Sequence, residues 1–177
     1  EKKKPNVSGI KLNLEVQRFE QDLFALDTND MSGSLAALAA NYPGFFNDFM
    51  GNILGIPAGE PQAAQIVKKF ITDFRPVKTA ADARFKDFAH IGNEVTQMLK
   101  YTRHYFPDYP IPSKLITFVG PMDAFYESSL GWSGDVITSS GLAVGLQMHL
   151  GAGSPMYAEE GGQGYPQYIS RRFEPSY

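Results

Sequence analysis

The stretch DVITSSGLAVGLQMHLG, residues 135–151, decides the fold, because it predicts two β-strands that fold back on each other. Ser140 and Gly141 separate its two apolar runs, as the turn residues of a hairpin do. In the second run, Leu, Val and Met alternate with Ala, Gly, Gln and His. This period of two predicts one continuous strand whose polar face carries Gln147 and His149.

Two other stretches have the pattern of strands. Residues 10–19, IKLNLEVQRF, alternate apolar and polar side chains, as a half-buried strand does. Residues 114–120, KLITFVG, are a short apolar and β-branched run suited to a buried strand. Together with the hairpin, these stretches predict a small, mainly antiparallel sheet.

Helical patterns fill the chain between these strands. Runs with helical spacing or strong helix formers cover residues 19–26, 34–42, 43–56 and 61–74. The last of them is expected to end before Pro76, because the residue preceding a proline disfavours helix. Thr79 and Asp82 form a capping pair that opens one long helix to Phe106. The predicted fold class is therefore α+β, with N-terminal helices packed on the sheet.

The length of 177 residues fits one domain, which we place at residues 10–177 after an N-terminal tether of residues 1–9. A hydrophobic fraction of 43% predicts a folded core. Nineteen acidic residues against sixteen Lys and Arg give a net charge of -3, which argues against a nucleic-acid partner. The absence of cysteine excludes disulfides and thiolate metal sites.

The residues that suggest chemistry fail the tests of spacing. His90, His104 and His149 lie too far apart for the helical zinc motif, in which two histidines stand four residues apart. The glycine runs GAGSPM and GGQG lack the spacing of a phosphate loop, and no Gly-x-Ser-x-Gly elbow is present. The sequence predicts no catalytic residue, no metal site and no cofactor within residues 1–177.

Polar and aromatic clusters leave an interaction face as the best candidate site. Paired acids at Glu20 with Asp22, and at Asp27 with Asp30, are expected on a solvated surface. A third acidic pair stands at Glu159–Glu160, and Arg171 and Arg172 suit either bidentate anion binding or surface pairs near Glu174. A groove for peptide or glycan would be lined by Trp132, Tyr157, Tyr165 and Tyr168. The candidate interaction face consists of Gln147, His149, Tyr157, Tyr168, Arg171 and Arg172.

Four segments together carry a family resemblance: IKLNLEVQRFEQDLFALD, NYPGFFNDFMGNILGI, GLQMHLGAGSPMY and YPQYISRRFEP. In this order they resemble the gliding motility lipoprotein GldB family of Bacteroidota. The resemblance implies an envelope protein that faces the periplasm and is anchored through a lipidated cysteine upstream of Glu1. It also implies protein partners in the gliding machinery and the type IX secretion system, and no established catalytic activity.

The same family is distantly similar to zincin-like metallopeptidases, which carry His-Glu-x-x-His on a helix beside a sheet edge. That motif is absent here, and the resemblance implies a longer chain with the corresponding helix beyond Tyr177. By this analogy, Gln147 and His149 border a substrate groove. The family pattern has an acidic residue at position 147 and tyrosine at position 149, so this chain departs from it at both.

Overall fold

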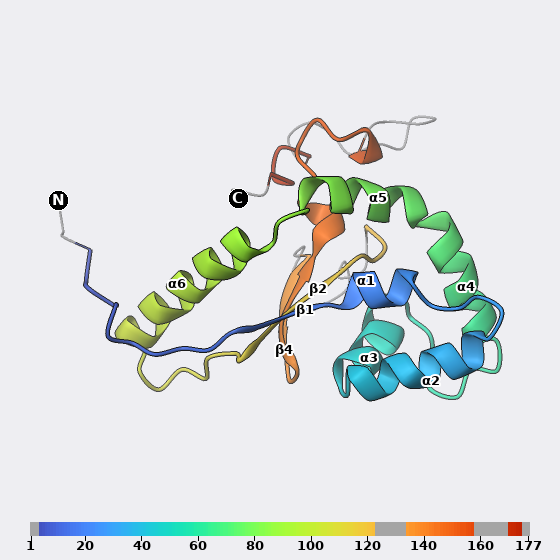
Figure 1. Ribbon diagram of the computed structural model, residues 1–177, viewed down its shortest axis with the longest axis horizontal. Coiled ribbons are helices and arrows are strands. Elements are labelled where there is room, and N and C mark those ends of the chain that lie inside the picture. Colours follow the sequence, from blue (N-terminus) through green and yellow to red (C-terminus); the bar gives the residue numbers. More distant parts are fainter. Residues whose placement is uncertain (1–3, 123–133, 158–169, 175–177) are drawn as a thin grey trace.

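The computed structural model describes residues 4–122, 134–157 and 170–174, and its α+β fold confirms the predicted class (Figure 1). Four strands form one sheet in the order β1-β2-β4-β3: β1 (Glu15–Arg18), β2 (Lys114–Phe118), β3 (Asp135–Thr138) and β4 (Gly141–Gly145). The α-helices are α1 (Phe19–Phe24), α2 (Met31–Asn41), α3 (Phe45–Asp48), α4 (Ala63–Asp73), α5 (Arg75–Arg84) and α6 (Ala89–Tyr105). A π-helix η1 (Phe49–Ile53) and the 3₁₀ turns η2 (Leu146–Met148) and η3 (Pro155–Tyr157) complete the described elements.

The sheet is mixed, so the prediction of a mainly antiparallel sheet is wrong. β2 pairs in parallel with both β1 and β4, and β3 pairs antiparallel with β4. The helical run α1 to α6 lies between β1 and β2 in the chain, and such a long crossover returns the chain in the same direction. Strand periodicity locates a strand along the chain, but it does not identify the neighbouring strand.

The predicted hairpin is confirmed, with Thr138 paired to Gly141 across its turn. Gly141 has a φ of 149°, and a Cβ there would lie 2.6 Å from the carbonyl oxygen of Lys114 on β2. Only glycine fits this close approach of β4 to β2. The continuous second strand is wrong, because the chain leaves β4 after Gly145 and enters the 3₁₀ turn η2.

The long helix predicted from Thr79 to Phe106 is two helices, α5 and α6, and α5 already begins at Arg75. Pro76 lies in the first turn of α5, where its missing N–H costs no helical hydrogen bond. The break falls between Phe85 and Phe88, which are both buried. The two rings lie 6.2 Å apart between centroids, so the chain between α5 and α6 is held by an aromatic contact within the core.

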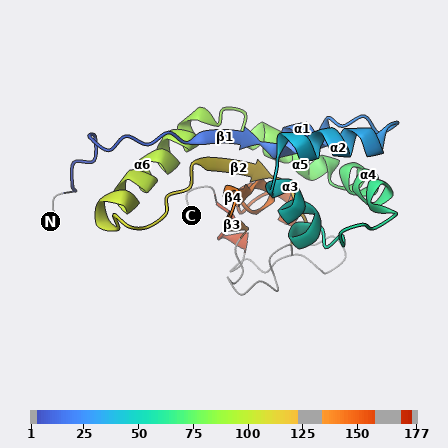
Figure 2. The same ribbon diagram turned by 90° about the horizontal axis from the view of Figure 1, so that it is seen from below.

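An aromatic cluster forms the centre of the core. Phe19, Phe45, Phe49 and Phe118 are each at most 1% exposed. The ring of Phe19 lies 5.0 Å from that of Phe45 and 4.8 Å from that of Phe49, measured between centroids. The ring of Phe118 lies 5.9 Å from that of Phe45 and 6.3 Å from that of Phe49, so the cluster packs α1, α3 and η1 against β2. In both views α6 extends toward the opposite end of the molecule from α2 and α4 (Figures 1 and 2).

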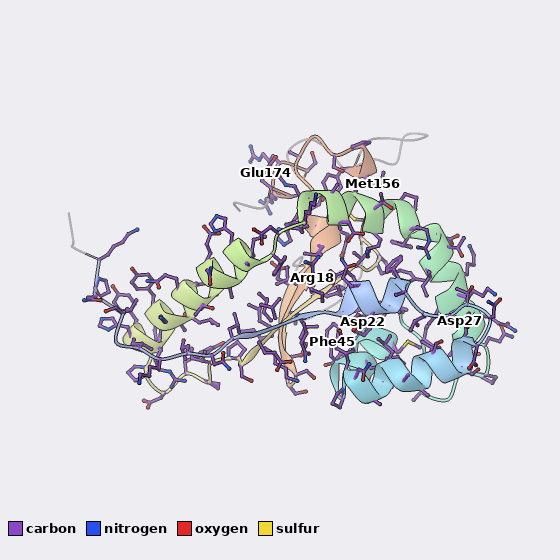
Figure 3. All side chains as sticks on the ribbon, in the orientation of Figure 1. Arg18, Asp22, Asp27, Phe45, Met156 and Glu174 are labelled. Atoms are coloured by element: carbon purple, nitrogen blue, oxygen red, sulfur yellow. The ribbon has the colours of Figure 1, made fainter. Side chains whose placement is uncertain are left out.

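A buried polar network joins β1, α1 and β2 at the edge of this core. Glu20 is 0% exposed, which overturns its predicted place on a solvated surface. Its carboxylate accepts hydrogen bonds of 2.6 Å from Arg18 Nε and of 2.6 Å from Thr117 Oγ1. Arg18 lies where β1 passes into α1 (Figure 3), and its guanidinium also covers the ring of Phe88 at 4.8 Å. We call these three residues the Arg18–Glu20–Thr117 network.

Substituting Glu20→Ala is expected to lower the free energy of unfolding by about 3–5 kcal/mol, because it leaves a largely buried guanidinium without its charge partner. Denaturant titration measures the loss. Glu15→Ala on exposed β1 surface is the matched control, with a change within about 0.5 kcal/mol. If Glu20→Ala does not fold, Glu20→Gln should show an intermediate loss, because its amide oxygen can still accept one of the two hydrogen bonds. Wild-type stability in both Glu20 variants would contradict the role of the network.

Candidate functional site

The predicted interaction face lies around the end of β4, and the structure places its residues in different environments. Gln147 and Tyr157 are buried, His149 is partly exposed, and Arg171 and Arg172 are exposed. Tyr168 lies outside the described residues. The acidic pair at 159–160 and the aromatic residues at 132 and 165 lie outside them too. The described part of the face is therefore smaller than the sequence predicts.

Gln147 is 1% exposed and links the ends of two strands. Its Oε1 accepts a hydrogen bond of 3.1 Å from the backbone N–H of Gly120, which follows β2. The predicted exposure of Gln147 on a polar strand face is corrected, because β4 buries the face of Gly141, Ala143 and Gly145, and Gln147 in η2 continues that buried face. Gln147 therefore stabilises the sheet end and does not border a groove.

His149 forms a pair with Asp135 at this end of the sheet. Its Nε2 lies 3.1 Å from both Asp135 Oδ1 and Oδ2, and the two side chains are 20% and 37% exposed. Asp135 Oδ1 also accepts a hydrogen bond of 3.3 Å from the N–H of Gly145. A carboxylate that holds one ring nitrogen fixes the orientation of the imidazole, which is how proteins prepare a histidine to bind or to transfer a proton.

Sequence reasoning named His149 but missed Asp135. The signal that would have found it is the register of the hairpin, in which Asp135 pairs with Val144. Folding back at the turn therefore brings the first residue of β3 next to the end of β4, close to position 149. The partner of His149 follows from strand pairing rather than from spacing along the chain.

Tyr157 is 3% exposed and holds the segment after β4 in place. Its hydroxyl donates a hydrogen bond of 2.6 Å to the carbonyl of Gln147 and accepts one of 2.9 Å from the N–H of Leu150. Its ring lies 4.6 Å from that of Phe173. This burial corrects the predicted position of Tyr157 on an interaction face and gives it a structural role.

Residues 170–174 return to the turn after β4 (Figure 3 labels Glu174). The N–H of Gly151 donates to the carbonyl of Phe173 at 2.9 Å, and the N–H of Ala152 donates to Glu174 Oε1 at 2.8 Å. Glu174 therefore accepts a hydrogen bond from the backbone of Ala152, and it follows Arg171 and Arg172 closely in the chain. The side chains of Arg171 and Arg172 are exposed to solvent next to this turn.

A second polar feature lies where α3 passes into the π-helix η1. Burial raises the pKa of the Asp48 carboxyl above its ordinary value, and the hydrogen bond from Asn52 Nδ2 at 3.3 Å offsets part of this rise. Its Oδ2 is buried and has no hydrogen-bond partner among the described residues. A short π-helix often marks a functional position in a helical segment, so the structure adds Asp48, directly before η1, as a candidate site residue.

Within the described ranges, no group of three or more histidines and acidic residues is placed to hold a metal ion. None of the helices in those ranges has the length and apolar character needed to cross a membrane.

Substituting Tyr157→Phe is expected to lower the free energy of unfolding by about 1–3 kcal/mol, because it leaves the N–H of Leu150 and the carbonyl of Gln147 without their buried partner. Thermal and denaturant unfolding measure this loss. Tyr105→Phe is the control, since Tyr105 is 60% exposed. Equal stability of the two variants would argue against the hydroxyl as the anchor of the segment.

Substituting Asp48→Asn is expected to raise the free energy of unfolding at pH 7. The folded pKa of Asp48 lies above the unfolded one, so the wild type loses stability as the pH rises through that folded pKa, and Asn carries no charge to bury. The gain should shrink as the pH falls and the carboxyl becomes protonated. Unfolding titrations from pH 3 to pH 8 test this, with exposed Asp108→Asn as control. A gain that does not depend on pH would contradict the explanation.

Comparison with known proteins identifies the family of this chain. A family model described as gliding motility protein GldB matches residues 1–177, the full length of the chain. The search of the curated proteins and the search of the solved structures each found no match. The match confirms the resemblance that the four sequence segments carry. The chain belongs to the family of the gliding motility protein GldB.

Proposed function

We propose that the protein is a noncatalytic lipoprotein of the cell envelope that serves the gliding machinery and is linked to type IX secretion. The observation that carries this proposal is the family match, because it covers residues 1–177 and its description names gliding motility. The partners would be protein components of that machinery.

A lipid anchor at the N-terminus, on a cysteine upstream of Glu1, fits the path of the first residues. Residues 4–14 precede β1 without helix or strand, and they extend away from the helices α1 to α4 (Figure 1). Such a segment gives the folded domain distance from a lipid attached before it. We place the anchored domain on the periplasmic side of the membrane, as the resemblance implies.

The use of the polar side chains supports a noncatalytic role. Glu20, Gln147 and Tyr157 each make hydrogen bonds within the fold and are at most 3% exposed. A reacting group must reach a substrate, so these three residues serve structure. Among the described residues near this end of the sheet, the exposed Arg171 and Arg172 are suited to contact an acidic partner surface.

The test is lipid labelling combined with a motility assay in the cells that produce the protein. With an alkyne fatty acid in the medium, the full-length protein should take up label and sediment with membranes, and replacing its acceptor cysteine by alanine should abolish both. Cells with that variant as their sole copy should lose spreading on agar. An unlabelled wild-type protein would refute the lipid anchor, and normal spreading without the protein would refute the gliding role.

A zincin-like zinc peptidase, active or degenerate, is the second candidate function, and the His149–Asp135 pair is the observation that favours it. A histidine held by a carboxylate is the arrangement found around many protein zinc ions. Metal analysis of the full-length protein separates the two functions. One zinc per chain, reduced in His149→Gln, would favour the peptidase, whereas a metal-free protein that supports gliding favours the noncatalytic lipoprotein.

A further inference from the structure

The far end of α6 exposes a cluster of apolar side chains. Helix α6 packs on the sheet near its start, where a Cβ at Gly92 would lie 3.2 Å from Val16 Cγ2. Toward its other end and just beyond it, four large side chains are exposed: Met98 by 49%, Tyr105 by 60%, Phe106 by 63% and Tyr109 by 43%. They are half of the eight exposed large apolar side chains in the described part of the chain.

These side chains lie together because of helical spacing. A shallow groove of about 500 Å³ runs along this part of α6, lined by Glu94, Gln97, Met98, Tyr101, Thr102, Tyr105 and Phe106. Steps of three and four residues place these positions on one face of the helix. Apolar surface on such a face is costly in water, so it indicates contact with another apolar phase.

The N-terminal segment reaches the same end of the molecule. In both views the first described residues lie at the end where α6 finishes, away from α2 and α4 (Figures 1 and 2). Val7 is 2% exposed, and Leu99 on α6 is 5% exposed, so this end of the protein is packed rather than loose. An anchor attached before residue 4 would therefore hold this end close to the membrane.

Charge at this end has the opposite sign to that of the whole chain. Residues 4–12 and 98–112 carry the basic residues Lys4, Lys11, Lys100 and Arg103, and Asp108 is their one acidic residue. In the chain as a whole, nineteen acidic residues outnumber sixteen basic ones. Basic residues thus outnumber acidic ones in these two segments beside the exposed aromatic cluster, and Glu94 adds one acidic side chain to the lining of the groove.

We propose that this end of the protein docks on the surface of an anionic phospholipid bilayer. We define the docking surface as Met98, Tyr105, Phe106 and Tyr109 with the basic residues Lys4, Lys11, Lys100 and Arg103. Tyrosine and phenylalanine side chains insert at the boundary between lipid head groups and acyl chains, and lysine and arginine attract anionic head groups. The inference rests on the proposed membrane anchoring and adds the orientation of the domain.

Lipid fits this surface better than a protein partner does. The cores of protein interfaces are depleted in lysine, whereas membrane-surface helices combine aromatic residues with lysine and arginine. The aliphatic stems of the basic side chains can lie along the apolar phase while their charges reach the head groups. Docked in this way, α6 lies at the membrane, and α2 and α4 point away from it (Figure 1).

Vesicle sedimentation tests the docking surface with the full-length protein made without its lipid anchor, the acceptor cysteine replaced by alanine. It should bind vesicles with one quarter phosphatidylglycerol in phosphatidylethanolamine better than vesicles of phosphatidylcholine, and salt should weaken the binding. The double variant Tyr105→Ser with Phe106→Ser should bind at least about tenfold more weakly. Each of Lys4→Gln and Lys11→Gln should cost about fivefold.

Matched controls lie at the other end of the molecule on α4. Ile66 is 41% exposed and the side chain of Lys69 is 76% exposed, so Ile66→Ser and Lys69→Gln should leave vesicle binding unchanged. Thermal unfolding checks that every variant keeps its fold. Equal binding to anionic and zwitterionic vesicles, or wild-type binding by the Tyr105/Phe106 double variant, would overturn the docking surface.

Sedimentation velocity tests for a second copy as the alternative occupant. A dimer that the Tyr105/Phe106 double variant dissociates would also overturn the proposal. The vesicle assay uses unlipidated protein. Its failure would refute the docking surface without contradicting the lipid anchor, which the labelling of cells tests. Failure of that labelling would in turn leave the vesicle result standing.

Discussion

The buried carboxylate of Glu20 is the interaction on which the junction of sheet and helices depends. It lies in the first turn of α1 and accepts hydrogen bonds from Arg18 on β1 and Thr117 on β2, two residues that are paired across the parallel strands. A buried charge is tolerated only when its partners are fixed, so the three side chains hold α1 in one direction relative to the sheet. Through the contact of Arg18 with Phe88, the same network reaches the break between α5 and α6.

Gln21 and Asp22, the two residues after Glu20, form hydrogen bonds to other helices in a similar way. Gln21 accepts a hydrogen bond of 3.0 Å from Lys78 Nζ and donates one of 2.7 Å to Asp82, both on α5. Burial alone would raise the pKa of Asp82, but the hydrogen bonds from Lys78 and Gln21 hold it below its ordinary value. Asp22 accepts a hydrogen bond of 2.5 Å from the hydroxyl of Tyr42 after α2, and burial, together with this bond, raises the pKa of Tyr42. The consecutive side chains of Glu20, Gln21 and Asp22 thus connect the short helix α1 to the sheet, to α5 and to the end of α2.

The sequence predicts local features well and non-local ones poorly. Alternation and helical spacing locate the strands and most of the helices, because each depends on the side-chain pattern within one element. The parallel pairing of β2 depends on contacts between distant segments, which spacing does not record. The helix break at Phe85 and Phe88 and the burial of Gln147 have the same origin, since tertiary packing overrides the local pattern at each. Of the candidate site, the sequence names His149, but its partner Asp135 follows only from the hairpin register.

Parallel pairing also explains why the two candidate surfaces lie at different ends of the sheet. β1, β2 and β4 run in one direction. The segments that precede β1 and β2 therefore enter at one end of the sheet, and the segment that follows β4 leaves at the other end. At the first end lie residues 4–14 and the connection from α6, which carry the proposed docking surface for lipid. At the second end lie the turn with His149 and residues 170–174, which include the exposed Arg171 and Arg172. If β2 ran antiparallel to β1 and β4, the connection from α6 would enter the sheet at the end where the segment after β4 leaves it, so the parallel pairing is what keeps α6 and the His149 turn at opposite ends.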